Sequence, residues 1–278
     1  MGADERVLLF IPAYNCERQI ARVLRKLGAA APPEVDAVLV VDNRSTDGTV
    51  DAALAGAEAL AGVPVTVLRN RENYGLGGST KVAFEFAAAH GYAWVLGLHG
   101  DDQGDLDDLL PLMRAGRHRG LDALLGARFH PGSRLVGYSL PRTLANHVFN
   151  ALYSAAARRR LLDLGSGINL YRVAPFAGGF HRRFPDDLTF NYCLALAHVR
   201  LGHRTEFFPI RWAEEDQVSN VRVLRQTAQV FAIVLSYLAA PDAFLAGEHR
   251  ARPRDAYPYE TLRAGAEAGA PTPPRGGG

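Results

Sequence analysis

An acidic segment, His99-Gly100-Asp101-Asp102-Gln103-Gly104-Asp105, holds the side chains best suited to chemistry. Carboxylates that directly follow an apolar run suit a hard divalent cation, Mg²⁺ or Mn²⁺, because such ions prefer oxygen ligands and commonly bridge carboxylates to substrate phosphates. Asp101 is therefore a candidate metal ligand, and Gly100 would let the backbone approach a bound molecule. Asp105 is expected to cap the helix that follows. The segment predicts a site for a metal and a diphosphate.

Two further polar segments could bind the rest of a nucleotide. Asp42 follows a second apolar run, where a carboxylate can accept from a nucleobase N–H or from ribose hydroxyls, although a simple turn carboxylate is an equal alternative. The glycine-rich segment from Asn73 to Ser79 leads into a helix N-terminus, where free backbone N–H groups favour anions. Asn73 and Gly75 are therefore candidate contacts to a phosphate or ribose, but glycines also simply make turns.

Four apolar runs must position these segments, since each run stops at a polar cluster. The runs are Val7–Phe10, Ala37–Val41, Val63–Leu68 and Trp94–Leu98. Near-continuous apolar runs of this length are typical of a parallel sheet buried on both faces. Ligands bind such sheets beyond the carboxyl ends of the strands. Asn15, Asp42 and Asp101 are therefore predicted to face one shared crevice.

The whole pattern predicts an α/β fold with a mostly parallel sheet flanked by helices, followed by a mixed second half. Helices between the first strands are expected at Glu17–Leu27, Thr49–Leu60, Gly78–Ala89 and Leu106–Arg117. The second half is expected to contain strands Ala123–Leu125, Ile168–Tyr171 and Thr205–Ile210 and helices Pro141–Arg159, Leu188–Arg200 and Val221–Ala239. The acidic loop Glu214-Glu215-Asp216 could act as a lid. Residues 241–278, rich in Pro, Gly, Ala and Arg, are expected to form a mostly disordered tail.

Composition narrows the choice of partners. The 31 basic and 29 acidic residues leave a net charge of +2, which predicts no nucleic-acid partner. Cys16 and Cys193 are expected to be reduced and buried. The chain starts without the pattern of a signal peptide, which favours a cytoplasmic location. Val230–Ala240 is too short for a membrane span of roughly 20 residues, so we expect a packed helix, with peripheral contact to the inner face of a membrane as the alternative.

Taken in order, these segments resemble the motifs of family 2 glycosyltransferases with the GT-A fold, over about residues 6–240. Ile11-Pro12-Ala13-Tyr14-Asn15 resembles the family's "IPAYN" strand end. The segment from Val41 to Thr49 resembles its "DDGSTDGT" loop, and Asn73-Tyr74-Gly75-Leu76-Gly77 its "NxGxG" turn. The acidic segment resembles "DxDGQHDP". Asp163–Arg172 is similar to the "DxxSGFRLYR" segment of the polyprenyl-phosphate branch, typified by dolichyl-phosphate mannose synthases.

The resemblance implies an inverting transfer of a sugar from a nucleotide-sugar donor, with UDP favoured and GDP second, assisted by Mg²⁺ or Mn²⁺. The acceptor would be a hydroxyl-bearing small molecule or a polyprenyl phosphate. Residues 1–240 would form a single domain, in which 1–128 bind the donor and 129–240 the acceptor. The implied donor contacts are Pro12, Ala13, Tyr14, Asn15, Asp42, Asn73, Gly75, Lys81, Gly100 and Asp101.

Three departures from the family pattern affect the chemistry. His99 occupies the position of the family's first metal-binding Asp. An imidazole can still bind Mn²⁺, although it carries one negative charge fewer than a carboxylate. Asn191 and Cys193 replace the acidic residues of "FDxEL", which removes the usual candidate base. Asn220 replaces the Lys of an "SK" motif that would meet a lipid phosphate, which argues against that acceptor.

Other residues could take over these roles. Asp186 and Asp187 are the nearest carboxylates to the altered motif and are the candidate bases, although both could merely cap a helix. Arg128, ahead of Lys81, is the candidate cation for the leaving diphosphate. Arg222 and Arg225 could replace the missing Lys or, because their spacing is helical, could form a solvated helix face.

Two other functions are consistent with parts of the sequence. A sugar-phosphate nucleotidyltransferase also uses a parallel sheet and an acidic metal site, but it usually has a Gly-rich phosphate loop where this chain has Pro12-Ala13-Tyr14-Asn15. A catalytically silent nucleotide-sugar binder would explain the lost carboxylates at His99 and Cys193. Turnover of a donor would separate a silent binder from an enzyme. The sequence specifies no oligomeric state.

Overall fold

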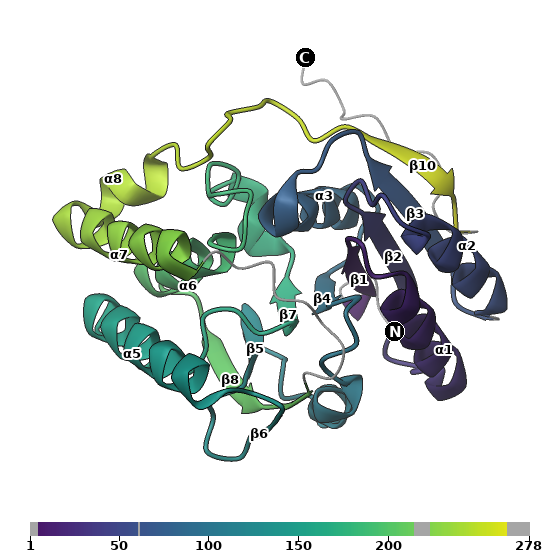
Figure 1. Cartoon of the computed structure of the whole chain (residues 1–278), viewed down its shortest axis with the longest axis horizontal. Coiled ribbons are helices and arrows are strands. Elements are labelled where there is room, and N and C mark those ends of the chain that lie inside the picture. Colours follow the sequence, from purple (N-terminus) through teal and green to yellow (C-terminus); the bar gives the residue numbers. More distant parts are fainter. Residues whose placement is uncertain (1–4, 61, 214–222, 266–278) are drawn as a thin grey trace.

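The structure is a computed structural model that describes residues 5–60, 62–213 and 223–265. Its central sheet is built from β1 (Val7–Ala13), β2 (Ala37–Asp42), β3 (Val65–Asn70), β4 (Trp94–Leu98), β5 (Ala123–Ala127), β7 (Ile168–Arg172), β8 (Thr205–Pro209) and β10 (Tyr259–Arg263). Neighbouring strands follow the order β10-β3-β2-β1-β4-β7-β5-β8 (Figure 1). A separate small sheet pairs β6 (Arg134–Val136) with β9 (Arg211–Ala213).

Strand direction determines where the polar segments meet. Strands β1 to β4 run parallel to one another, whereas β7 runs antiparallel to both β4 and β5. This mostly parallel sheet confirms the predicted fold class. In the register, Ala13 pairs with Asp42 and Phe10 with Gly97. The carboxyl ends of β1, β2 and β4 therefore lie together at one edge of the sheet.

Helices cover both faces of the sheet (Figure 1). They are α1 (Glu17–Ala30), α2 (Thr49–Ala59), α3 (Gly75–Ala89), α4 (Leu110–Arg114), α5 (Leu140–Ala157), α6 (Phe190–Arg200), α7 (Val223–Ala239) and α8 (Pro241–Ala246). Along β1, Leu8 and Phe10 point into a core shared with α3 and α6, while Leu9 and Ile11 point into a core shared with α1 and α2. Because successive strand residues face opposite sides, burial on both faces requires the continuous apolar runs seen in the sequence.

The predicted helix Leu106–Arg117 is divided in two. A 3₁₀ turn covers Leu106–Asp108, and the short helix α4 follows it. Pro111 lies in the first turn of α4 and has no backbone N–H, so it cannot continue a hydrogen-bonded ladder from the preceding turn. The Asp105 carboxylate accepts from the backbone N–H of Asp107 at 2.9 Å, which confirms the expected cap.

The expectation of a disordered tail from residue 241 is wrong over residues 241–265. Helix α8 packs Phe244 into the core, and β10 pairs antiparallel with β3. A few aromatic anchors, including the buried Tyr257, outweigh the polar and Pro-rich composition, because each aromatic side chain buries a large apolar area. Residues 266–278 lie outside the described residues, as do the acidic loop expected to act as a lid and Asn220, Arg222 and the side chain of Arg225.

Helix α7 is packed as expected from its sequence. Val230, Val234 and Tyr237 are buried on its inner side. Among the described residues, no helix combines the length and the apolar character that crossing a membrane requires. Cys16 and Cys193 are buried and unpaired, as predicted.

Two buried histidines make the fold sensitive to acid. His181 and His198 are each 2% exposed, and burial lowers the pKa of each imidazole to about 3. Neither ring nitrogen of His181 has a hydrogen-bond partner, and the rings of Phe84, Phe176 and Phe180 surround it. The folded state therefore holds neutral imidazoles, whereas the unfolded chain takes up protons below its ordinary pKa of about 6.5.

We therefore expect stability to fall as the pH drops from about 6.5 towards 3, by about 1.4 kcal/mol per pH unit for each buried histidine. His181→Phe should remove about 1.4 kcal/mol of the loss between pH 7.5 and pH 5.5, measured by urea unfolding. The control is His147→Gln, a substitution at an exposed histidine measured over the same pH range. An H181F protein that loses as much stability at pH 5.5 as wild type would contradict this assignment.

Candidate active site

A cavity of about 320 Å³ opens at the edge where β1, β2 and β4 end. It is bounded by the predicted residues Pro12, Ala13, Tyr14, Asn73, Gly75, His99, Gly100 and Asp101. Residues that are far apart in the chain therefore converge on one cavity, although of the three side chains expected to share a crevice, Asn15, Asp42 and Asp101, only Asp101 lines it. Cys16, Asn43, Leu76, Ser79 and Leu188 complete the lining and were not singled out from the sequence.

The acidic segment separates its two adjacent carboxylates. Asp101 lines the cavity, and the backbone N–H of Gln103 donates to its Oδ1 at 3.3 Å. Asp102 instead binds Arg22 at 2.9 Å and Lys26 at 2.7 Å, both on α1. Gly100 approaches the first strand so closely that an added Cβ would lie 2.9 Å from the carbonyl oxygen of Pro12. Only Asp101 of the two is therefore available to a ligand in the cavity.

His99 and Asp101 can serve one cation together. The Nδ1 of His99 lies 3.9 Å from the Oδ2 of Asp101, a separation that two ligands of one ion at about 2.1 Å each can span. Burial lowers the pKa of His99, Asp101 opposes that shift and Arg128 adds to it, so the imidazole is held in the neutral form that binds metals. Among the described residues, no group of three or more His, Cys, Asp and Glu is arranged to hold a metal ion. The pair would therefore need further ligands from water or a diphosphate.

The structure corrects the predicted role of Asp42. Its side chain is 0% exposed and does not line the cavity. The backbone N–H of Ser45 donates to the carboxylate at 3.2 Å, and Arg69 Nε lies 3.3 Å from it. Asp42 thus holds the loop after β2, because a buried carboxylate needs such partners. The adjacent Asn43 reaches the cavity instead.

Asn15 also supports this loop and does not line the cavity. It has a positive φ of 48°, and its side-chain oxygen accepts from the backbone N–H of Thr46 at 2.9 Å. Ser45 Oγ in turn accepts from the backbone N–H of Asn15 at 3.0 Å. The two loops that follow β1 and β2 are therefore fastened to each other beside the cavity.

Three amide side chains form a hydrogen-bonded chain beside the cavity: Asn43 and Asn73 line it, Asn70 is buried behind them, and only Asn73 was predicted as a contact. Asn43 Nδ2 donates to Asn73 Oδ1 at 2.8 Å, and Asn70 Nδ2 donates both to Asn43 Oδ1 and to Ser79 Oγ at 3.0 Å. Asn70 is fully buried at the end of β3. The only signal was the position of Asn43 and Asn73 inside the two family-like segments. Their pairing depends on tertiary structure.

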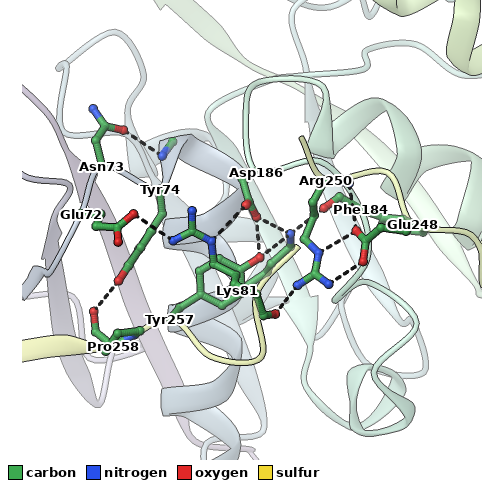
Figure 2. A network of polar contacts seen from close by, with 12 residues as sticks. Glu72, Asn73, Tyr74, Lys81, Phe184, Asp186, Glu248, Arg250, Tyr257 and Pro258 are labelled. Atoms are coloured by element: carbon green, nitrogen blue, oxygen red, sulfur yellow. Dashed lines mark hydrogen bonds and ion pairs between the residues drawn. The ribbon is translucent and has the colours of Figure 1, made fainter. Parts of the chain in front are cut away.

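Lys81 and Asp186 are paired with each other, which corrects both predicted roles. Lys81 is fully buried and does not line the cavity, so it cannot meet a diphosphate there. Its Nζ lies 2.6 Å from Asp186 Oδ1 (Figure 2). Burial lowers the pKa of Lys81, and Asp186 opposes that shift. Asp186 is thereby engaged as a counter-ion and is not placed as a base.

The other two predicted catalytic residues also lie away from the cavity lining. Asp187 accepts from the backbone N–H of Thr189 at 2.8 Å, a contact within the turn that precedes α6, whose N-cap is Thr189 itself. Arg128 forms a two-pronged ion pair with Asp163, with Nε and Nη2 each 2.8 Å from a carboxylate oxygen. The Arg128 guanidinium is also 5.4 Å from the ring of Trp212. It remains close enough to His99 to lower that pKa.

Asn191 and Cys193, which replace the acidic residues of the family motif, provide no carboxylate at these two positions. Asn191 lines a small cavity of about 30 Å³ that shares Pro12, Leu76 and His99 with the larger one. Cys193 is fully buried, and burial raises the pKa of its thiol. Burial likewise raises the pKa of Cys16 to about 11. Neither thiol is therefore suited to act as a base near neutral pH.

In α/β proteins with an open, mostly parallel sheet, ligands bind beyond the carboxyl edge of the strands, where this chain has its cavity. The model of Glycosyl transferase family 2 matches residues 9–180, and the chain belongs to that family. It is therefore a transferase enzyme of the glycosyltransferase class, which removes the nucleotidyltransferase alternative. No curated protein matches the chain in sequence.

Several solved structures share the fold at low sequence identity. Glucosyl-3-phosphoglycerate synthase from Mycobacterium tuberculosis in complex with UDP is 18% identical with a TM-score of 0.57, covering 86% of this chain and 82% of that one. Mannosyl-3-phosphoglycerate synthase from Rubrobacter xylanophilus is 17% identical with a TM-score of 0.56, covering 89% and 77%. TarS 1–349 of S. aureus is 18% identical with a TM-score of 0.57, covering 87% and 69%.

Two glycines with nearly the same φ allow a test of how tightly the cavity wall is packed at Gly75. Gly75 (φ 69°) and Gly91 (φ 70°) share a left-handed backbone, but an added Cβ would lie 2.4 Å from the Asp186 carbonyl oxygen at Gly75 and meets nothing within 4 Å at Gly91. We expect Gly91→Ala to cost about 1–2 kcal/mol through backbone strain alone. Gly75→Ala should cost more, in urea unfolding, because the wall must move. Equal losses in the two variants would show that the contact at Gly75 is unimportant.

Proposed function

We propose that this enzyme moves a sugar, with inversion, from a nucleoside diphosphate sugar to an anionic acceptor, with UDP as the favoured nucleotide and GDP second. The observation that carries the proposal is the cavity at the edge of β1, β2 and β4, which has Asp101 and His99 in its lining. Its volume of about 320 Å³ is in the range of ligand sites. A complex of the Mycobacterium tuberculosis synthase with UDP and Mn²⁺ supports the choice of nucleotide.

Asp101 and His99 would hold the divalent cation, Mn²⁺ or Mg²⁺. When bound, such a cation neutralises charge on the leaving diphosphate. Mn²⁺ suits the pair better than Mg²⁺, because an imidazole is a ligand of transition metals whereas Mg²⁺ prefers oxygen. Pro12, Ala13, Tyr14, Asn73, Gly75 and Gly100 would contact the donor, and Asn43 and Ser79 would add polar contacts.

Arg128 would stabilise the negative charge of the diphosphate from a distance, through the electrostatic potential of its guanidinium group. Asp163 fixes its guanidinium, and the side chain is 11% exposed, so the charge sits in a stable position near His99. Lys81, Asp42 and Asn15 keep only indirect roles, through the segments that they hold in place.

The acceptor is inferred from the carboxylates that face the cavity. Among the described lining residues, Asp101 is the only Asp or Glu, and it is assigned to the cation. A hydroxyl acceptor needs a general base within hydrogen-bond reach, whereas a phosphate is already an anion and needs none. This favours a polyprenyl phosphate over a hydroxyl-bearing small molecule among the acceptors that the resemblance implies. An assay of UDP-sugar turnover with polyprenyl phosphate, against 3-phosphoglycerate, separates the two classes.

The adjacent carboxylates Asp101 and Asp102 provide the test of donor binding. We expect Asp101→Asn to weaken Mn²⁺-dependent UDP binding at least about tenfold in titration calorimetry, since about 1.4 kcal/mol of cation binding is lost. Asp102→Asn breaks only the contacts to Arg22 and Lys26, so it should retain UDP binding and lose some thermal stability.

Unchanged Mn²⁺-dependent binding in D101N would remove the metal assignment. A wild-type protein that binds UDP and Mn²⁺ tightly but never turns over a UDP-sugar, with or without acceptor, would instead support the silent-binder alternative.

An exposed apolar face supports a membrane-associated acceptor. On α5, Leu140 is 84% exposed, and Leu144 and Val148 follow it at intervals of four residues. On the neighbouring α7, Phe231, Leu235 and Leu238 are also exposed, and the rings of Phe149 and Phe231 are 6.0 Å apart. We call these six exposed residues the apolar face. Patches of this kind on soluble proteins commonly mark contact sites.

The charge balance of α5, α7 and the residues that flank α5 favours an anionic lipid surface as the partner of this face. Residues 134–160 contain five arginines and no Asp or Glu, and residues 223–240 contain no Asp or Glu. Apolar side chains combined with arginines are the composition of helices that lie in a membrane interface. We therefore propose that the apolar face contacts the inner surface of a membrane and brings the active site to its lipid acceptor.

Vesicle sedimentation tests this contact. Wild type should bind vesicles that contain phosphatidylglycerol and bind pure phosphatidylcholine vesicles less, because the arginines add an electrostatic attraction that salt weakens. Leu144→Glu combined with Leu235→Glu should reduce binding several-fold. The control is Leu201→Glu, at an exposed leucine outside the apolar face. Unchanged binding in the double variant would refute the proposal, as would a stable dimer in light scattering that only the double variant dissociates.

A further inference from the structure

Lys81 is the centre of a buried polar network behind the cavity (Figure 2). Its Nζ donates to the carbonyl oxygen of Phe184 at 2.6 Å, to Asp186 Oδ1 at 2.6 Å and to the Tyr257 hydroxyl at 3.0 Å. An ammonium group has three donors, so these three acceptors satisfy it completely. The Tyr257 hydroxyl donates to the same Asp186 Oδ1 at 2.5 Å. Lys81 and Tyr257, from distant parts of the chain, therefore share one carboxylate oxygen of Asp186.

Tyr257 belongs to the segment between α8 and β10, residues 247–258, which we call the strap. In Figure 1 the strap runs along the top of the view, past α3, from α8 to β10. Tyr74 holds it at one end, since its hydroxyl donates to the Pro258 carbonyl at 2.9 Å and its ring packs edge-on against Tyr257 at 5.3 Å. Arg254 lies 4.7 Å from the ring of Tyr74. The strap is thus fastened to the residue that immediately precedes α3.

Asp186 connects this network to the cavity through its backbone. Its carbonyl oxygen accepts from the N–H of Gly78 at 3.1 Å and is the atom that an added Cβ at Gly75 would strike. Gly75 and Leu76 line the cavity, and so does Leu188, two residues beyond Asp186. The position of Asp186 therefore sets both parts of this wall.

A buried ion pair is weak evidence for stability, because desolvation offsets most of its attraction. Such a pair does restrict geometry, since displacement of either partner would leave a buried charge unsatisfied. Apolar residues could fill the same space without fixing the direction of the Asp186 backbone. The network is therefore better explained by control of position than by stability alone.

We propose that Lys81, Asp186 and Tyr257 are positioning residues for donor binding, and that the strap delivers the Tyr257 hydroxyl that locks the wall formed by Gly75, Leu76 and Leu188. The inference rests on the proposed function, because it takes the cavity to be the donor site. Its consequence is that a residue of the C-terminal segment, with no contact to the cavity, controls how well the enzyme binds its nucleotide.

Tyr257→Phe tests the proposal, because it removes one hydroxyl and keeps the ring that packs on Tyr74. We expect UDP with Mn²⁺ to bind at least fivefold more weakly, while the melting temperature changes little. In the slow hydrolysis of UDP-glucose, KM should rise by a similar factor with kcat within twofold, because the wall contacts the donor and not the reacting bond. Tyr259→Phe, at an exposed tyrosine of β10, should change none of these values.

Hydrogen exchange provides a readout that requires no ligand. The amides of residues 75–79 should exchange faster in Y257F than in wild type or Y259F. Wild type that binds no nucleotide would refute the proposed function. If the amides of residues 75–79 still exchanged faster in Y257F, the network would position the wall, but the wall would not be part of a donor site. If wild type binds UDP and Y257F matches it in both affinity and exchange, the positioning role is refuted while the proposed function survives.

Discussion

The structure depends first on the parallel register of β1, β2 and β4. The pairing of Ala13 with Asp42 and of Phe10 with Gly97 brings the ends of these strands to one edge. Charged groups cannot remain unpaired between two apolar layers, so polar side chains collect where the strands end. The cavity, with Tyr14, Asn43 and Asp101 in its lining, is the result of that constraint.

The requirement that buried charges be paired divides the charged residues into those held in internal ion pairs and those that face the cavity. Arg128 is paired with Asp163, Lys81 with Asp186, and Arg69 with Asp42, and each pair has at least one member that is almost fully buried. Buried charges require such partners. These pairs hold loops and helix ends in place, and Asp101 remains as the carboxylate that faces the cavity. Neighbouring carboxylates can therefore differ in role, as Asp101 and Asp102 do.

The C-terminal segment joins the two halves of the molecule. Strand β10 extends the sheet at its edge beside β3, while α8 packs against α7 and its Phe244 lies against Tyr237. The connection between them carries Tyr257 to Lys81 and Asp186. A segment whose composition is typical of disorder thus supports the wall of the candidate donor site, because a few aromatic and charged side chains find specific partners.

The sequence by itself determined the fold class, the four parallel strands and the cavity edge, because burial on both faces of a sheet imposes continuous apolar runs that can be recognised locally. It also determined most of the cavity lining, since residues after a strand must lie at that edge. Only the tertiary structure decided that Asp42, Lys81 and Asp186 are engaged in internal pairs and that Asn43 reaches the cavity. Ion pairing and burial depend on which distant residues meet, as Lys81 and Tyr257 do although 176 positions separate them, and spacing along the chain does not reveal such contacts.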